Sequence, residues 1–316
     1  MSIFVSHKSA LEYWRIHRVL PNNSTRRRYR GALPGNPPST EQARLSGLSL
    51  PLHTMQGKRS TRWASKAMKQ HVFAGKTPEG CFICIEETFF VSSPEFCFLQ
   101  MASVFPLSGL IELGYELCGT YSKPVAWATD IPERGFYIRE PLTSKKKLET
   151  FCDRMPGIKG RRKALRALRY ILGGAASPME TKVSMLLTLP YMLGGFGFEL
   201  PELNKRITLS KNARKYFDKD YYVCDLYWPE KKIAVEYDSD QQHTGSERIA
   251  SDSKRRNALS TSGINVVSIT KQQLYSSTEL ESAARTIAGY MQRRLFSKKS
   301  NFYARYHELR RQLLGE

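Results

Sequence analysis

The sequence of 316 residues lacks the features that would place it in or across a membrane. No stretch approaches the run of about 18 apolar residues that a membrane-spanning helix needs. The first ten residues, MSIFVSHKSA, lack the basic start and the following apolar run of a secretory signal. We therefore expect a cytoplasmic protein that makes no membrane contact.

The sequence also has little of the cysteine pattern that builds zinc sites. Among its six cysteines only Cys81 and Cys84 show C-x-x-C spacing, and no second pair or His pair completes a ligand set. Both lie in CFICIEETFFV, which predicts a strand over 82–91. Because side chains alternate along a strand, the two thiols would point to opposite faces. We expect buried, reduced cysteines.

Acidic residues are scarce. The chain has 29 Asp and Glu against 49 Lys and Arg, a formal net charge of +20, and this excess predicts attraction to polyanions such as nucleic acid. No acid lies between residues 158 and 172. Four bases there follow helical spacing on one face: Lys159, Arg162, Arg166 and Arg169. They predict phosphate contacts, with a solvated helix face as the alternative.

Hydrophobic residues make up 41% of the chain, which is enough for a sizeable core. The pattern divides the chain into four parts. They are a basic α+β N-terminal lobe (1–140), a basic connecting helix (141–176), a central α/β domain (177–296) and a basic C-terminal helix (297–316). In the lobe we expect a helix within 1–20, and another that begins at Ser93-Pro94-Glu95, where Ser suits the N-cap and Pro the first turn.

From residue 177 onward the pattern becomes regular. A helix begins at Ser177, and the order that follows is strand, strand, strand, helix, strand, helix. The expected ranges are 205–209, 221–228, 232–238, 247–260, 264–270 and 278–295. Several strands followed by a strand–helix–strand return predict an α/β domain with a mixed sheet flanked by helices.

Two carboxylates interrupt otherwise apolar strands. Asp225 lies in YYVCDLYWP, and Glu236 lies in KIAVEYD. A tight turn at Pro229-Glu230-Lys231 would join these strands and place the acids opposite each other, or nearly so. Burying two adjacent carboxylates is costly, and each raises the pKa of the other, unless a cation compensates them. Their hard oxygen ligands predict Mg²⁺ or Mn²⁺.

Other residues near these strands complete a candidate catalytic set. Asp238 shares a strand face with Glu236 and is a possible third acid, although Asp is also a common turn former. His243 follows in a polar loop, where it could orient or deprotonate water. Arg248 and Arg255 lie on the expected helix near Asp252, a spacing that surface ion pairs also explain.

The order of these features resembles the very-short-patch-repair (Vsr)-like branch of the PD-(D/E)XK endonuclease superfamily, which has a restriction-endonuclease-like fold. The match covers about residues 177–270. The acids come first: Glu180 at a helix start, Asp225 in a strand, and the pair in Glu236-Tyr237-Asp238. His243 and the D-x-x-R sequence of a helix, Asp252-Ser253-Lys254-Arg255, follow. Leu259, Gly263 and the final strand INVVSIT complete the match.

This resemblance implies a Mg²⁺-dependent phosphodiesterase. Asp225 and Glu236 would hold the metal, and Glu180 would bind a second ion or support the first through water. His243 would assist proton transfer, and Arg255 would contact phosphate or brace the acids. Glu180 also has an alternative role, because Ser177 and Glu180 have the spacing of a capping box.

Two departures from the family pattern leave a second function open. Asp238 stands where the superfamily usually has a lysine, and Ser239 replaces a glycine. We therefore expect a metal-dependent DNA endonuclease, with phage defence or mobile-element biology as candidate contexts. The alternative is a silent nuclease fold that acts as a DNA-binding regulator or antitoxin-like repressor. The N-terminal lobe faintly resembles abortive-infection-type antitoxins at Ser6-His7-x-x-Ala10 and Ser93-Pro94-Glu95, which suggests a nucleic-acid or protein partner.

Overall fold

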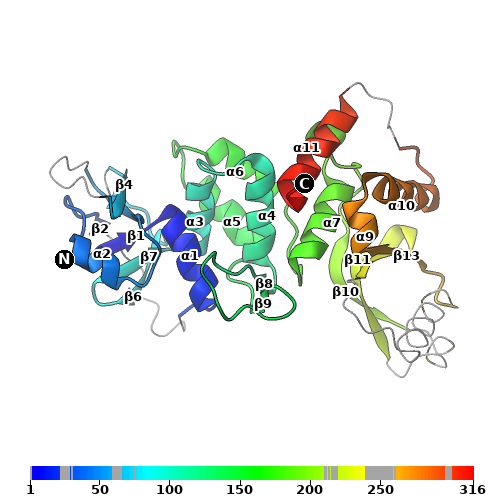
Figure 1. Cartoon of the computed structure of the whole chain (residues 1–316), viewed down its shortest axis with the longest axis horizontal. Helices are drawn as coiled ribbons and strands as arrows, with labels where there is room; N and C mark the ends of the chain where they lie inside the picture. The colour runs from blue at the N-terminus through cyan, green and yellow to red at the C-terminus, as the bar shows by residue number, and fades with distance from the viewer. Residues whose placement is uncertain are drawn as a thin grey trace. The chain divides into compact units, whose positions relative to one another are not determined.

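The computed structural model divides the chain into two compact units, Met1–Ile171 (unit 1) and Leu172–Glu316 (unit 2) (Figure 1). The residues that the structure describes are 2–21, 29, 31–58, 66–74, 76–209, 212, 214, 220–238, 259, 261–295 and 301–316. Within these ranges, no helix combines the length and the apolar character needed to cross a membrane.

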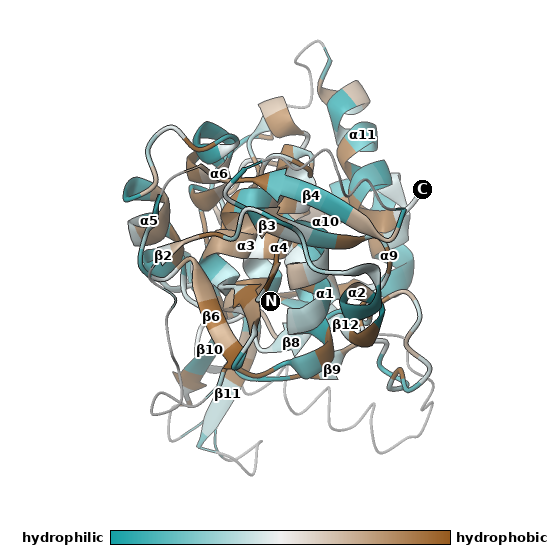
Figure 2. Cartoon of the chain, turned by 90° about the vertical axis from the view of Figure 1, so that its left-hand side faces the viewer, coloured by the Kyte–Doolittle hydropathy of each residue, from teal (hydrophilic) through white to brown (hydrophobic). Residues whose placement is uncertain are grey.

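Unit 1 is built on a five-stranded sheet in the order β4-β3-β1-β7-β6. The central strand β1 pairs parallel with β7 and antiparallel with β3, while β3 and β4 are parallel. Figure 2 shows that the edge strand β6 is largely hydrophobic and the opposite edge β4 largely hydrophilic. The strands are β1 (Ile3–Val5), β3 (Leu52–Gln56), β4 (Met68–Val72), β6 (Phe82–Glu86) and β7 (Phe89–Ser92).

The prediction of one strand over 82–91 was wrong. The chain turns at residues 87 and 88, and β6 and β7 form an antiparallel hairpin. The polar pair Glu87 and Thr88 interrupts the apolar run and supplies this turn. Two small two-stranded sheets complete the β structure of unit 1, β2 (Gly31–Ala32) with β5 (Lys76–Thr77) and β8 (Tyr121–Ser122) with β9 (Tyr137–Ile138).

The helices of unit 1 are α1 (His7–His17), α2 (Thr40–Leu45), α3 (Pro94–Met101), α4 (Leu107–Cys118), α5 (Lys145–Asp153) and α6 (Arg161–Leu168). The predicted helix start at Ser93 is confirmed, since its side chain accepts a hydrogen bond from Phe96 N. The predicted connecting helix over 141–176 was wrong. Gly157 and Gly160 have φ of +78° and +92° and separate α5 from α6, and both helices pack against α3.

Unit 2 contains a four-stranded mixed sheet in the order β10-β11-β12-β13. The first two pairings are antiparallel and the last is parallel, which confirms the predicted α/β class with a mixed sheet. Helix α7 (Pro178–Thr188) packs against β11 and β12. The strands are β10 (Glu202–Thr208), β11 (Tyr221–Trp228), β12 (Ile233–Asp238) and β13 (Asn265–Thr270).

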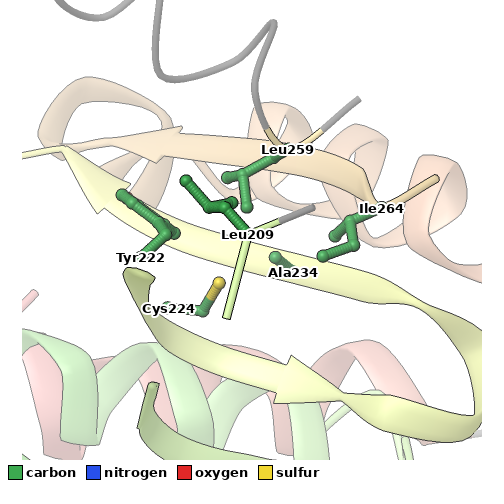
Figure 3. Close-up of a cluster of buried hydrophobic side chains, with 6 residues drawn as sticks. All are labelled: Leu209, Tyr222, Cys224, Ala234, Leu259 and Ile264. Atoms are coloured by element: carbon green, nitrogen blue, oxygen red, sulfur yellow. The ribbon is translucent and has the colours of Figure 1, made fainter. Parts of the chain in front are cut away.

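The remaining elements of unit 2 are the short helices η1 (Tyr191–Leu193) and η3 (Pro229–Lys231), together with α9 (Lys271–Tyr275), α10 (Ser277–Tyr290) and α11 (Phe302–Leu314). The predicted final helix thus corresponds to α10. Nearly all of the predicted helix over 247–260 lies outside the described residues. Buried side chains from the end of β10, from β11 and β12, and from the chain before β13 form one core cluster (Figure 3), namely Leu209, Tyr222, Cys224, Ala234, Leu259 and Ile264.

The C-terminal segment is an integral part of unit 2 rather than a separate basic helix. Arg310 of α11 is fully buried and donates hydrogen bonds to the carbonyl oxygens of Leu274 and Tyr275, both at 2.9 Å. Its guanidinium also pairs with Glu316. A buried arginine with these partners holds α11 against α9, so the predicted boundary before residue 297 was wrong.

All six cysteines are free, as expected. Five are buried and Cys84 is partly exposed. Burial raises the pKa of Cys81, Cys97, Cys118 and Cys152 to about 12, so these thiols stay protonated and unreactive near neutral pH.

Candidate active site

The two strand carboxylates lie on neighbouring strands of one hairpin. β11 and β12 are joined through η3 and pair in the register Leu226↔Val235, Tyr227↔Ala234 and Trp228↔Ile233. One further step of the same register would set Asp225 opposite Glu236. Here the main-chain pairing ends, and Tyr237 N instead donates a hydrogen bond of 2.8 Å to Asp225 Oδ2. The carboxylate of Asp225 therefore reaches the backbone of the residue next to Glu236.

Glu236 is buried within the sheet. It is 5% exposed, and β12 places it beside Ser268 of the parallel strand β13. Ala234, which shares a strand face with Glu236, is fully buried, and so are Ile233 and Val235 on the other face, so both faces of β12 lie in the core. A carboxylate at such a position is costly to ionise unless hydrogen bonds or nearby charges compensate it.

Glu180 lies in the first turn of α7 and is 8% exposed. Ser177 Oγ accepts a hydrogen bond of 3.1 Å from Glu180 N, so Ser177 is the N-cap. The carboxylate oxygen Oε2 accepts from Ala176 N at 2.9 Å and from Asn204 Nδ2 at 2.8 Å. Only half of the predicted capping box forms, because the Glu180 carboxylate bonds the N–H of Ala176 rather than that of the N-cap Ser177, and through Asn204 it ties α7 to β10.

Asn204 connects this acid to the hairpin and was not predicted from the sequence. It has φ of +46° within β10, and its amide also donates to Gly174 O at 2.9 Å. Its neighbours pair as Leu203↔Leu226 and Lys205↔Cys224, so Asn204 lies across from Asp225. The signal available in the sequence was an asparagine inside a strand pattern, where this residue type is disfavoured.

Of the other members of the predicted catalytic set, the structure describes only Asp238. Asp238 is the last residue of β12 and is exposed. His243, Arg248 and Arg255 lie outside the described residues. In the ranges that the structure covers, no group of three or more His, Cys, Asp or Glu side chains is arranged to hold a metal ion. The donors that lie on neighbouring strands are two carboxylates, Asp225 and Glu236, and such hard oxygen ligands fit Mg²⁺ or Mn²⁺.

Helix α6 carries the predicted basic surface in unit 1. Its inward cations have structural partners, because Arg161 Nε donates to Cys152 O at 2.7 Å and Lys163 Nζ donates to Phe105 O at 2.9 Å. Four others are exposed and make no hydrogen bond or ion pair with any described residue: Lys159, Arg162, Arg166 and Arg169. The prediction that all four share one helical face was wrong for Lys159, which lies before α6 on the far side of Gly160, whose φ is +92°. The first turn of α6 contains no acid. These four charges are therefore available to an external polyanion.

Unit 1 also contains a histidine cluster that was not predicted. The rings of His7 and His71 stack with centroids 3.5 Å apart, and His71 Nε2 lies 3.0 Å from His53 Nδ1. Burial, followed by the charges of the other two histidines and of Lys69, lowers the pKa of His7 to about 3. Burial and nearby positive groups lower the pKa of His53 and of His71 to about 4. The three rings are neutral at pH 7.

Comparisons of the chain with protein-family models, with curated proteins and with solved structures found no match. The functional interpretation therefore depends on the residues and the geometry of unit 2 and of α6.

Proposed function

We propose that unit 2 is a restriction-endonuclease-like domain that hydrolyses phosphodiester bonds of DNA with Mg²⁺ or Mn²⁺, and that the protein acts in the cytoplasm. The observation that carries the proposal is the hairpin of β11 and β12. It carries the buried Glu236 on the strand that pairs with the strand of Asp225, and the carboxylate of Asp225 accepts a hydrogen bond of 2.8 Å from Tyr237 N. A divalent cation would compensate this pair of negative charges.

Each residue has a distinct role in the proposed site. Asp225 and Glu236 would hold the ion, which when bound polarises the phosphate and lowers the pKa of water. The Tyr237 N–H fixes the orientation of Asp225, while Asn204 links Asp225's strand to Glu180. We assign proton transfer to His243, which follows β12 in the chain.

Unit 1 would contribute phosphate contacts from Arg162, Arg166 and Arg169 of α6 and its C-cap, and from Lys159 just before the helix. Arg248 and Arg255 would add contacts from the segment after β12. Guanidinium groups bind phosphate through two parallel N–H bonds, which suits the arginines of α6 to a DNA backbone.

The test is incubation of supercoiled plasmid with the full-length protein and Mg²⁺ or Mn²⁺, beside Asp225→Asn and Glu236→Gln. Both changes remove charge but keep an oxygen that can accept a hydrogen bond. Glu230→Gln is the matched control, because Glu230 is an exposed acid on the turn of the same hairpin. We expect cutting by the wild type and Glu230→Gln only. Equal nicking by all four proteins, or by none, would contradict the proposal.

A second candidate function is a DNA-bound regulator on a catalytically silent nuclease fold. The observation that favours it is Asp238, an exposed acid where this type of site usually has a lysine, together with the basic face of α6. This function predicts duplex binding that survives Asp225→Asn and falls with salt. Replacing Arg162, Arg166 and Arg169 with Gln should lower the salt slope by about 2.7, or about 0.9 per lost phosphate contact.

The control for this binding measurement is Arg285→Gln. Arg285 is an exposed cation that already pairs with Glu281 on α10, so its loss should leave DNA affinity unchanged. Binding that is independent of salt in the wild type would remove the phosphate-contact argument for both candidate functions.

A further inference from the structure

Strand β11 has one side that is consistently less buried than the other. In β11 the buried positions alternate with exposed or partly exposed ones, and the latter include Tyr221, Val223 and Asp225. The register pairs Val223 with Arg206 of β10. Because paired residues share a face, Arg206 lies on the same side of the sheet as Asp225.

Arg206 is stacked on Tyr221. Its guanidinium carbon is 3.5 Å from the centre of the tyrosine ring, a cation–π contact that orients the planar group. Arg206 itself is exposed, and it makes no hydrogen bond or ion pair with any residue in the described ranges. Its N–H donors therefore face solvent while the ring holds the plane in position.

The other arginine–aromatic stacks in the described part of the chain differ in this respect. Arg18 lies over Tyr137 and donates to Ile16 O at 3.0 Å. Arg293 contacts Phe198 and donates to Gly197 O at 2.8 Å. The buried Arg310 has main-chain acceptors as well. In each case the donors are used within the protein, which is the usual structural role of such an arginine.

Neighbouring cations on β10 and on the chain between β10 and β11 are already compensated. Lys205 pairs with Glu202 at 2.6 Å, and Arg214 pairs with Asp220 at 2.9 Å. The guanidinium of Arg206 thus has a fixed plane, N–H donors that are accessible to solvent, and no acidic partner among the described residues. A planar fork of N–H donors matches a phosphate group geometrically.

We propose that Arg206, held by Tyr221, binds a backbone phosphate of the DNA strand whose bond is hydrolysed at Asp225 and Glu236. The inference rests on the proposed nuclease function and adds a positioning residue to it. Tyr221 precedes Asp225 by four residues, a span of roughly 13 Å in an extended strand. At a rise of about 3.4 Å per nucleotide, the contacted phosphate lies within about four nucleotides of the cut.

The first test measures duplex DNA affinity without metal over a range of salt. Arg206→Ala should lower the salt slope by about 0.9 and weaken binding about eightfold at 0.1 M salt. Tyr221→Leu should produce part of this loss, and Tyr221→Phe, which keeps the ring, should not. Lys205→Ala is the control, since it removes an adjacent cation on the other side of β10. Equal losses in Arg206→Ala and Lys205→Ala, or none in either, overturn the proposal.

The second test places single neutral methylphosphonates along a duplex that the wild type cuts. One position within about four nucleotides of the cut should weaken wild-type binding but not the binding of Arg206→Ala, because the two changes remove the same contact. Additive losses at every position overturn the proposal. If Arg206→Ala weakens binding and the wild type cuts no DNA, the nuclease function fails and the phosphate contact stands. If the wild type cuts and Arg206→Ala binds normally, only the contact fails.

Discussion

Glu116 of unit 1 and Glu180 of unit 2 are both buried, but they are stabilised by different partners. In unit 1, Glu116 is 1% exposed and accepts from both Arg15 Nε at 2.9 Å and Arg15 Nη2 at 2.7 Å. Burial alone would raise the pKa of Glu116, but the Arg15 guanidinium outweighs burial and lowers it. This carboxylate is neutralised by its own protein, so its role is to hold α4 against α1.

In unit 2, Glu180 is buried to a similar degree but is held by neutral donors. Its hydrogen bonds come from Ala176 N and Asn204 Nδ2, and no cation within the described ranges pairs with it. The charge of Glu116 is therefore neutralised within the protein, whereas the charge of Glu180 remains available to a cation from outside. An uncompensated carboxylate near Asp225 increases the negative potential that would attract a divalent cation.

The largest expected effect comes from the acid pair. Asp225→Asn should lower metal-dependent DNA cleavage by at least about a hundredfold, as the loss of a preorganised charged group in an active site typically does. The measurement is the initial rate of plasmid nicking. Removing the charge should leave the melting temperature unchanged or raised, because it relieves repulsion from Glu236. A large fall in stability would instead make Asp225 a structural acid like Glu116.

Breaking the pair in unit 1 should affect stability rather than activity. Glu116→Gln leaves the largely buried Arg15 without its counter-charge, which should cost about 3 kcal/mol of the free energy of unfolding. Chemical denaturation followed by tryptophan fluorescence would measure this, because Trp14 lies in α1. Glu308→Gln, which alters an exposed ion pair with Arg311, should leave the stability nearly unchanged. Equal losses in both variants would contradict the assignment.

Acid should destabilise unit 1 through its histidine cluster. The pKa of His7 is lowered to about 3 and those of His53 and His71 to about 4, against about 6.5 in the unfolded chain. Unfolding therefore takes up protons between about pH 6.5 and 4, so stability is complete above this window and falls as pH decreases through it. We expect the melting temperature to drop by roughly 10 °C or more from pH 7 to pH 5.

His71→Gln should reduce that acid-dependent loss, because it removes one titrating ring and keeps groups that can hydrogen-bond to His53. His307→Gln changes an exposed histidine of α11 and should preserve the wild-type profile. A pH profile that is the same in all three proteins would exclude the cluster as the cause.

The smallest expected effect is the loss of the helix cap beside Glu180. Ser177→Ala removes the acceptor for Glu180 N and should cost about 1 kcal/mol of stability. Denaturation curves would measure this cost, and nuclease activity measured well below the melting temperature should be retained. A larger loss of activity than of stability would indicate that the cap positions Glu180 for the reaction.

Local patterns were enough to predict much of unit 2. The strands β11 and β12 and the turn at Pro229 follow from alternation, β-branched residues and a short breaker segment, all of which act between near neighbours. The caps at Ser93 and Ser177 were predictable for the same reason. Asp225 and Glu236 were therefore placed on neighbouring strands before the register was known.

Other features depended on contacts between distant residues and could not be predicted. Arg310 reads as one more surface base of a C-terminal helix, yet it is buried against main-chain oxygens from residues 274 and 275. The histidine cluster joins residues from α1, β3 and β4, which are 18 to 64 positions apart. The division of the basic segment into α5 and α6 required two glycines with positive φ.

The sequence by itself determined the basic charge of the protein, the succession of the strands of unit 2 along the chain and the presence of an acid on each strand of its hairpin, because charge and periodicity are local properties. Only the tertiary structure decided which charged groups are compensated. It paired Glu116 with Arg15, gave Glu180 neutral donors and left Arg206 stacked on Tyr221 with its donors toward solvent. Compensation depends on distances of a few ångströms between segments far apart in the chain, and these exist only after folding.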